Sequence, residues 1–337
     1  MFRGAILGAG NVALLGHVPG WQARSDVTIV AAADARPGAE AAVREALPDA
    51  RFYRSAEELY AKETLDFVDV AAPPATHAAL AGEALERSLH VLCEKPLVLS
   101  SADLLALTAL ATRKERALVT VHNWLYAEPI LRAREIVASG ALGDVRRVAW
   151  SVVRKEPARV ASGGGVNWRL DPSVSGGGIS VDHGWHALYA VRSLLLDDWT
   201  SVSARFEKRR FTELLVEDTA TLSLRSDRVW AEIFLTWAGD ERSNRIEVEG
   251  SRGRVIVEGT RVFVDGALGA SEEALLTSLA DGSQHPEWFA GVAQLFVGEM
   301  TDSARRGGNL AEAALCVKTL EAARASSEAG GAWRPVA

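Results

Sequence analysis

The sequence predicts an α/β fold with two domains, one built on a parallel sheet and the other on an antiparallel sheet. The 337 residues are enough for about two domains. Over the first third, near-continuous apolar runs alternate with helical patterns, which is typical of a parallel sheet covered on both faces. After about residue 122, closely spaced runs with period 2 indicate an antiparallel sheet. We therefore expect domains at 1–122 and 123–337.

The first domain is expected to alternate strands with helices. The expected strands are Ala5–Leu7, Val27–Ala33, Phe67–Ala71, His90–Cys93 and Leu118–Val121. The expected helices are 37–47, which has a proline at its start, 75–88 and 102–114.

The second domain is expected to begin with a helix and a strand and to continue into the antiparallel sheet. A glycine-rich loop is expected over Ser162–Gly178, followed by a helix over Asp182–Leu196. The other expected helices are 130–139 and the stretch from about 287 to the end, and the expected strands are 146–153, 201–208, 219–224, 228–237, 245–248, 255–258 and 261–264.

Composition excludes several classes of protein. The net charge of −7 leaves no electrostatic footprint for nucleic acid or anionic lipid. Cys93 and Cys316 match no metal or redox spacing, which favours two buried thiols in a reducing cytosol. No segment is apolar and long enough to span a bilayer. The uncharged stretch Gly4–Ala23 faintly resembles a signal peptide, but its glycines and Pro19 favour a buried strand and a turn, so we expect a cytoplasmic protein.

A glycine-rich turn after the first strand indicates a dinucleotide site. The segment Gly8-Ala9-Gly10-Asn11-Val12-Ala13 has the pattern G-x-G-x-x-A, between an expected strand and an expected helix. The first glycine allows the tight turn, the second allows the backbone to approach the pyrophosphate, and the small third residue packs helix against strand. The pyrophosphate is expected on the N–H groups of Asn11, Val12 and Ala13 at the start of the helix, where the dipole favours an anion.

Asp34 closes the second expected strand, near the spacing of a ribose-binding carboxylate. A carboxylate there accepts hydrogen bonds from ribose hydroxyls and repels a 2′-phosphate, which favours NAD. Arg36, two residues later, could instead bind that phosphate, so NADP stays possible.

Two short segments supply candidates for catalysis. Lys95, in Glu94-Lys95-Pro96 at the end of a strand, could donate to a carbinol or carbonyl oxygen. Asp182 and His186 have the i, i+4 spacing that places two residues on one face of a helix, and His186 could act as a general base. Zinc binding by this pair and simple helix capping by Asp182 are the alternatives. No third ligand has useful spacing, so we expect no metal.

Together these motifs resemble the glucose–fructose oxidoreductase / inositol dehydrogenase / rhizopine-catabolism (Gfo/Idh/MocA) family. Besides those above, the matching segments are Pro73-Pro74-Ala75-Thr76-His77, Trp168-Arg169 and Ser175-Gly176-Gly177-Gly178, all in the family's order. The resemblance implies an N-terminal Rossmann domain and a C-terminal α/β domain with a large open sheet that is often used for oligomerisation. It thus implies a homo-oligomer, a dimer or tetramer, formed through that sheet.

The resemblance also implies roles for single residues. It implies Lys95, Asp182 and His186 as the catalytic group, with the Lys95–Pro96 peptide often cis. It places Pro73, His77 and Glu94 at the cofactor. The expected substrate contacts are Lys95, Asn123, Trp168, Arg169, Asp182, His183 and His186.

The chain departs from the family's pattern at two positions. Leu125 stands where relatives often carry arginine, and His183 stands at a position that is usually apolar. His183 could be a packed core histidine or an additional substrate contact. Both departures concern the substrate and leave the reaction class unchanged.

The sequence therefore predicts an NAD(P)-dependent dehydrogenase acting on a secondary carbinol of a sugar, inositol or related polyol. Two alternatives stay open. One is a redox-neutral enzyme that cleaves glycosides with tightly held NAD, and the other is a catalytically silent, NAD-binding regulatory protein.

Overall fold

The computed structural model describes residues 1–158, 167–266 and 269–336, which form two compact units. The first unit comprises Met1–Asn123 and Gly282–Ala314. The second comprises residues 124–158, 167–266, 269–281 and 315–336. The domain boundary expected at residue 122 remains a proposal. No helix in the described part of the chain is both long enough and apolar enough to cross a bilayer.

The first unit is built on a parallel sheet, as the alternating apolar runs predicted. Within the described residues this sheet has six strands in the order β3-β2-β1-β4-β5-β6, and every neighbouring pair is parallel. The strands are β1 (Phe2–Leu7), β2 (Val27–Ala33), β3 (Arg51–Tyr53), β4 (Phe67–Val70), β5 (His90–Cys93) and β6 (Leu118–Thr120). The short strand β3 and the helix after it were not among the expected elements.

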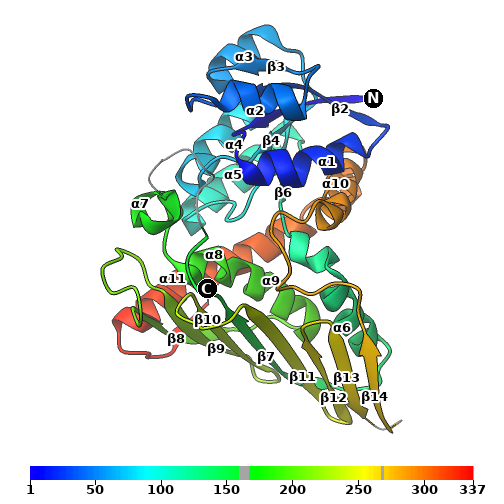
Figure 1. The fold of residues 1–337 in the computed structure, drawn as a ribbon, viewed down its shortest axis with the longest axis vertical. Coiled ribbons are helices and arrows are strands. Elements are labelled where there is room, and N and C mark those ends of the chain that lie inside the picture. The colour runs from blue at the N-terminus through cyan, green and yellow to red at the C-terminus, as the bar shows by residue number, and fades with distance from the viewer. Residues whose placement is uncertain (159–166, 267–268, 337) are drawn as a thin grey trace. The chain divides into compact units, whose positions relative to one another are not determined.

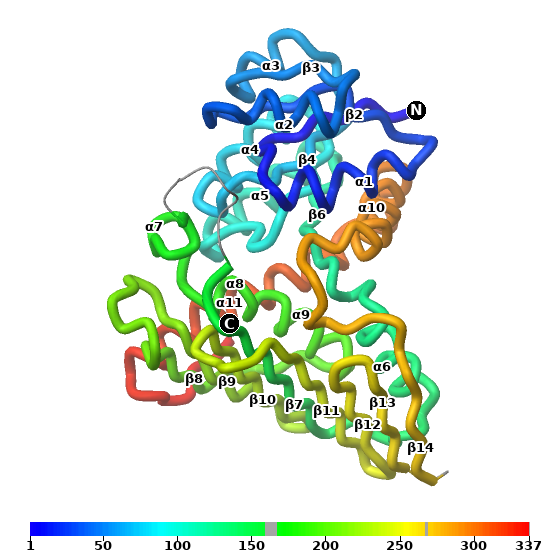
Figure 2. The backbone as a smooth tube through the Cα atoms, in the orientation of Figure 1, coloured from blue at the N-terminus to red at the C-terminus, as the bar shows by residue number. Residues whose placement is uncertain are grey.

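Helices join these strands and pack against one another. They are the π-helix η1 (Val12–His17), α1 (Val18–Gln22), α2 (Ala39–Ala46), α3 (Ala56–Lys62), the 3₁₀ helix η2 (Pro74–Thr76), α4 (His77–Glu86), α5 (Ser101–Lys114), α10 (Pro286–Thr301) and η5 (Ser303–Arg305). The hydroxyls of Ser55 and Ser100 cap α3 and α5 by accepting backbone N–H groups. Helix α1 packs against α10, which lies beside it in Figure 2, and α4 packs against α5.

The strand order reverses at the centre of the first sheet, between β1 and β4. The chain moves outward from β1 through β2 to β3 and then crosses back to β4. In open α/β sheets a ligand binds outside the carboxyl ends of the strands at such a reversal. The turn that begins at Gly8 leaves β1 at this point.

The second unit carries a large open sheet that is mostly antiparallel, as expected. Within the described residues its strand order is β14-β13-β12-β11-β7-β10-β9-β8-β15, and only the β7–β10 pair is parallel. The strands are β7 (Val145–Val153), β8 (Ser201–Glu207), β9 (Thr219–Arg225), β10 (Trp230–Thr236), β11 (Ser243–Gly250), β12 (Gly253–Glu258), β13 (Arg261–Gly266), β14 (Gly269–Ala274) and β15 (Arg334–Pro335). Side chains of β7 alternate between buried and half-buried positions, so one face of the sheet is packed.

Helices cover that packed face, as Figure 1 shows for α8 and α9 over the central strands. The helices of the second unit are α6 (Glu128–Ala138), η4 (Trp168–Leu170), α7 (Pro172–Ser175), α8 (Ile179–Asp182) and α9 (Gly184–Leu195). Two more, η3 (Asn123–Tyr126) and α11 (Gly308–Glu328), span the division between the units. The loop expected over Ser162–Gly178 contains η4 and α7, while residues 162–166 lie outside the described residues.

The prediction of a single helix over Asp182–Leu196 is wrong. Asp182 is the last residue of α8, and α9 begins at Gly184, so Asp182 and His186 lie on two successive helices. The joint is His183, whose backbone angles of φ −99° and ψ −26° depart from those of an ideal helix. The N-cap residue of α9 is His183, and its side chain makes no capping hydrogen bond.

Candidate functional site

The glycine turn of the first unit has the geometry that a dinucleotide requires. Gly8 has a φ of +96°, and a Cβ there would lie 2.6 Å from the backbone nitrogen of Ala72. A Cβ at Gly10 would meet nothing within 4 Å. Ala13 is fully buried against the sheet. The fold itself therefore needs glycine at position 8, whereas the space beside Gly10 is open, so these residues fit a bound pyrophosphate.

Asn11 and Val12 begin the helix after this turn. Asn11 has helical backbone angles, and its side chain caps no backbone group of η1. The helix continues from η1 into α1, and Leu14 donates its N–H to the carbonyl of Gly10. The expected contact of Asn11 and Val12 with a pyrophosphate remains a proposal.

Asp34, at the end of β2, accepts hydrogen bonds from the glycine turn and from Arg36. Its Oδ2 accepts the N–H of Ala9 at 2.8 Å, and its Oδ1 accepts the backbone N–H of Arg36 at 2.8 Å. The Arg36 guanidinium donates to Asp34 Oδ2 at 2.8 Å and to the Ala9 carbonyl at 2.9 Å. Burial raises the pKa of Asp34, but these donors outweigh it and hold that pKa below its usual value. Asp34 is therefore a carboxylate at neutral pH.

The other predicted cofactor residues lie on the loops after β4 and β5. His77 is fully buried, and its ring nitrogens lie 2.7 Å from the carbonyls of Pro96 and Ala72. Burial lowers the pKa of His77. Its side chain thus links the Pro73 loop to the segment after Lys95, and the Lys95–Pro96 peptide is cis.

Glu94 belongs to a buried charge network that the sequence analysis did not find. His17 lies between two carboxylates, with Nδ1 3.0 Å from Asp69 Oδ2 and Nε2 3.1 Å from Glu94 Oε1. Trp21 donates its indole N–H to the same Asp69 oxygen at 2.7 Å. The other oxygen of Glu94 accepts the backbone N–H of Lys95 at 2.9 Å. This network therefore fixes the carboxylate next to the predicted catalytic lysine.

The network holds a protonated imidazole. Burial lowers the pKa of His17, but attraction to Asp69 and hydrogen bonds to Asp69 and Glu94 raise it to about 10. The ring also stacks on Phe289 of α10 at 4.1 Å between centroids. One signal for this network was present in the sequence, since Asp69 interrupts an apolar strand, and a buried charge needs a partner.

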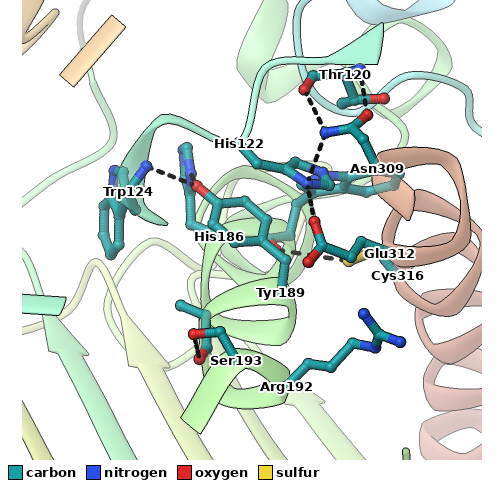
Figure 3. Close-up of polar contacts among 12 residues, drawn as sticks. Thr120, His122, Trp124, His186, Tyr189, Arg192, Ser193, Asn309, Glu312 and Cys316 are labelled. Carbon is teal, nitrogen blue, oxygen red and sulfur yellow. Dashed lines mark hydrogen bonds and ion pairs between the residues drawn. The ribbon is translucent and has the colours of Figure 1, made fainter. Parts of the chain in front are cut away.

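In the second unit, His186 is held by a tyrosine hydroxyl and by one stacked tryptophan ring. Its Nδ1 lies 2.7 Å from the Tyr189 hydroxyl, which also accepts the backbone N–H of Trp124 at 3.1 Å (Figure 3). The Trp124 ring stacks on His186 at 4.5 Å and on Trp150 at 5.9 Å. The imidazole is therefore restricted in orientation, as a general base requires.

The N-terminus of α8 is positioned by Glu217, another residue the sequence analysis missed. Its carboxylate accepts the N–H groups of Gly178 and Ser180 at 2.9 and 3.1 Å. A Cβ at Gly178 would lie 2.0 Å from the Glu217 carbonyl oxygen, so the S-G-G-G segment needs glycine here. This contact fixes the helix that ends in Asp182.

The remaining predicted residues are distributed between the units. Lys95 and Asn123 lie in the first unit, and Trp168, Arg169, Asp182, His183 and His186 lie in the second. The Arg169 guanidinium lies over the Trp168 ring at 4.3 Å. His183 is half-buried, with Nδ1 3.4 Å from Asp182 Oδ2. Among the residues that the structure describes, no group of three or more His, Cys, Asp or Glu side chains is arranged to hold a metal ion.

A parallel sheet with a dinucleotide turn, joined to a second open sheet, defines the class of NAD-binding oxidoreductases. Residues 2–122 match the model of the oxidoreductase family with an NAD-binding Rossmann fold, and residues 130–256 match that of the GFO/IDH/MocA C-terminal domain. The chain belongs to the GFO/IDH/MocA family of oxidoreductases. This confirms the family that the motifs predicted.

Individual relatives are distant. The chain is 30% identical over 217 residues to an uncharacterized oxidoreductase of Schizosaccharomyces pombe, covering 64% of this chain and 57% of that protein. It is 30% identical over 142 residues to the D-apiose dehydrogenase of Paraburkholderia graminis, covering 42% and 38%. An oxidoreductase from Agrobacterium radiobacter, solved with NAD⁺, L-tartaric acid and magnesium, has a TM-score of 0.85 at 23% identity and covers 99% and 98%. The chain thus matches 57% of the length of the first of these two curated relatives and 38% of the length of the second.

Proposed function

We propose that this chain is an NAD-dependent dehydrogenase that oxidises a secondary carbinol of a sugar, inositol or related polyol. The observation that carries the proposal is the oriented imidazole of His186 in a chain whose first unit has the dinucleotide turn. D-apiose dehydrogenase, a relative over part of the chain, is named for a sugar substrate. The catalytically silent alternative has no observation in its favour.

The residues divide the chemistry among them. NAD, when bound, supplies the acceptor for a hydride from the carbinol carbon. His186 takes the proton of the carbinol hydroxyl as general base, a contribution of about 10²–10⁴-fold. Lys95 donates a hydrogen bond to the same oxygen, and Asp182 is the third member of the proposed catalytic group. Asn123, Trp168, Arg169 and His183 contact the rest of the substrate.

The surroundings of Asp34 support NAD over NADP as cofactor. Its carboxylate is ionised, and such a group accepts ribose hydroxyls and repels a 2′-phosphate. The Arg36 guanidinium donates to Asp34 and to the Ala9 carbonyl, so it is engaged by the protein. Gly8, Gly10, Asn11, Val12 and Ala13 are proposed to hold the pyrophosphate, with Pro73, His77 and Glu94 nearby.

A spectrophotometric screen tests this function. NAD⁺ or NADP⁺ is supplied with aldoses, inositols, sugar acids or glycosides, and formation of the reduced cofactor is followed. Lys95→Ala is expected to abolish turnover. Lys62→Ala is the matched control, because Lys62 is exposed and its pair with Glu58 lies on the solvent-exposed surface of α3.

Each result of the screen has a distinct meaning. Turnover with NAD⁺ that disappears in Lys95→Ala supports the dehydrogenase. Cleavage of a glycoside without net NADH identifies the redox-neutral enzyme instead. Binding of NAD without turnover on any compound contradicts the proposal and favours a regulatory protein.

Two coarser features complete the proposal. We infer a cytoplasmic location, which the burial of both cysteines, Cys93 and Cys316, supports. We also propose a homo-oligomer formed through the open sheet of the second unit, which the molar mass in solution tests.

A further inference from the structure

A buried arginine stands at the end of β7, on the packed side of the second sheet. Arg154 is only 4% exposed, and its backbone N–H donates to Thr236 of β10 at 2.8 Å. Its Nη1 donates to the carbonyls of Val153 and Ser243 at 2.8 and 3.0 Å, whereas Nε has no partner. Within the described residues, no carboxylate forms an ion pair with it. A buried charge without a counter-charge is costly, which points to a missing partner.

The charges around Arg154 indicate the sign of that partner. Burial and the positive charge of Arg242 together lower the pKa of Arg154 to about 9. Asp182 acts in the opposite direction. Asp281 in turn acts on Arg242, so Arg154, which has no ion pair in the described residues, is the group to which an added anion would be attracted.

Other buried donors without partners lie on the same side of the sheet. The indole N–H groups of Trp150 and Trp237 have no acceptor in the described part of the chain, and neither side-chain atom of Asn244 has a partner. Asn244 of β11 pairs with Val152 of β7, and Trp237 directly follows β10, whose last residue pairs with Val153. Arg154, Trp237 and Asn244 are therefore close together at one end of three adjacent strands. Buried donors without protein partners are rare in native proteins, and an acceptor-rich ligand would satisfy the donors of this group.

We propose that Arg154, Trp237 and Asn244 form a subsite for a carboxylate of the substrate, so that the enzyme acts on a sugar acid. The proposal deepens the proposed function and rests on it. The link is Asp182, a proposed catalytic residue whose charge acts on Arg154. The internal hydrogen bonds of Arg154 use Nη1 alone, so the edge formed by Nε and Nη2 is not occupied by them. That edge matches the two oxygens of a carboxylate. A phosphate dianion would be repelled more strongly by Asp182.

Kinetics with matched substrates test the subsite. D-glucuronate, D-glucuronamide and D-glucose are compared, with the corresponding galactose series in parallel, because the amide keeps the shape of the acid and removes its charge. We expect kcat/KM for an acid to exceed that for its amide at least about tenfold, since a charge-assisted hydrogen bond contributes roughly 1.5–3 kcal/mol. Arg154→Met should reduce this acid-to-amide ratio to near unity, and Arg154→Lys should retain part of it. Arg261→Met, an exposed arginine on the same sheet, is the control that keeps the ratio.

A binding measurement separates this proposal from the proposed function. Calorimetric titration of the full chain with D-glucuronate and D-galacturonate, in the presence of NAD⁺, requires no turnover. Acid binding that is weakened in Arg154→Met supports the subsite even if no hydride transfer occurs. Equal kcat/KM for acid and amide in the wild-type protein, or acid affinity unchanged in Arg154→Met, overturns it. If Arg154→Met fails to fold, the comparison of kcat/KM for acid and amide in the wild-type protein still tests the subsite.

Discussion

The imidazole of His17 contacts both carboxylate oxygens of Asp69, with Nδ1 3.1 Å from Oδ1 and 3.0 Å from Oδ2. The two residues are 52 positions apart and almost wholly buried. Together with Glu94, a proposed cofactor residue, they place a positive charge between two negative charges. Removing the cation would leave two buried carboxylates, which typically costs roughly 3–5 kcal/mol.

This network predicts how stability depends on pH. The pKa of His17 is raised from 6.5 to about 10, so above pH 6.5 the folded chain keeps a proton that the unfolded chain releases. The stabilisation is therefore complete below pH 6.5 and is lost as pH rises through about 10. We expect the free energy of unfolding in urea to decrease over this range in the wild-type protein and to decrease less in His17→Asn.

His90→Asn is the matched control for that experiment. His90 lies in the same unit, but burial and nearby arginines lower its pKa to about 4. It is therefore neutral in both states above about pH 6.5, and its replacement should leave the slope unchanged. The same slope in wild type and His17→Asn would contradict a protonated His17.

The two glycines of the turn should respond differently to alanine. In Gly8→Ala the new Cβ meets the Ala72 backbone at a φ of +96°, so we expect a lower melting temperature and lost cofactor binding. In Gly10→Ala the Cβ meets nothing in the protein, so the melting temperature should not change. The affinity of Gly10→Ala for NADH, measured by fluorescence titration, should fall at least about fivefold because crowding a close contact costs roughly 1–3 kcal/mol. Wild-type affinity in Gly10→Ala would place the pyrophosphate elsewhere.

Replacing Asp34 should shift the cofactor preference toward NADP. Asp34→Ser removes the carboxylate that repels a 2′-phosphate and that engages Arg36. We expect the ratio of kcat/KM for NADP to that for NAD to rise roughly tenfold to hundredfold, the value of a charge-assisted hydrogen bond. The double variant Asp34→Ser/Arg36→Ala should lack this gain. A ratio unaffected by Asp34→Ser would show that Asp34 does not select the cofactor.

Tyr189 is expected to act as a positioning residue for His186. Tyr189→Phe removes the hydroxyl next to Nδ1 and leaves the Trp124 N–H without that acceptor. We expect kcat to fall by up to about tenfold, the value of one hydrogen bond, while the KM for NAD changes little. Tyr60→Phe removes a buried hydroxyl that has no partner among the described residues, and it should leave kcat unchanged. Equal losses in both variants would indicate a purely structural role for Tyr189.

The sequence predicted those parts of the site that local spacing determines. Gly8, Gly10 and Asp34 follow consecutive strands, and the strand order brings the two turns together at one edge of the sheet. The two sheets could be predicted because they leave different apolar patterns. A parallel sheet that is buried on both faces has continuous apolar strands, whereas an antiparallel sheet that is packed on one face has strands of alternating apolar and polar residues.

The parts that the sequence did not predict depend on long-range packing. His17, Asp69 and Glu94 meet only after three segments fold together, and Arg154 looks like an ordinary strand end until its burial is known. The single helix expected over Asp182 and His186 failed because periodicity does not reveal a backbone change at one residue, His183. In each case the missing information is tertiary.

The central claim is that the chain transfers a hydride from a carbinol carbon to NAD. The most direct measurement incubates the full chain with NAD⁺ and a sugar or polyol deuterated at its carbinol carbons, and then examines the reduced cofactor by mass spectrometry. The account predicts NADH that carries deuterium on the nicotinamide ring, with none formed by Lys95→Ala. Reduced cofactor without deuterium, or substrate turnover with no reduced cofactor at any stage, would contradict it.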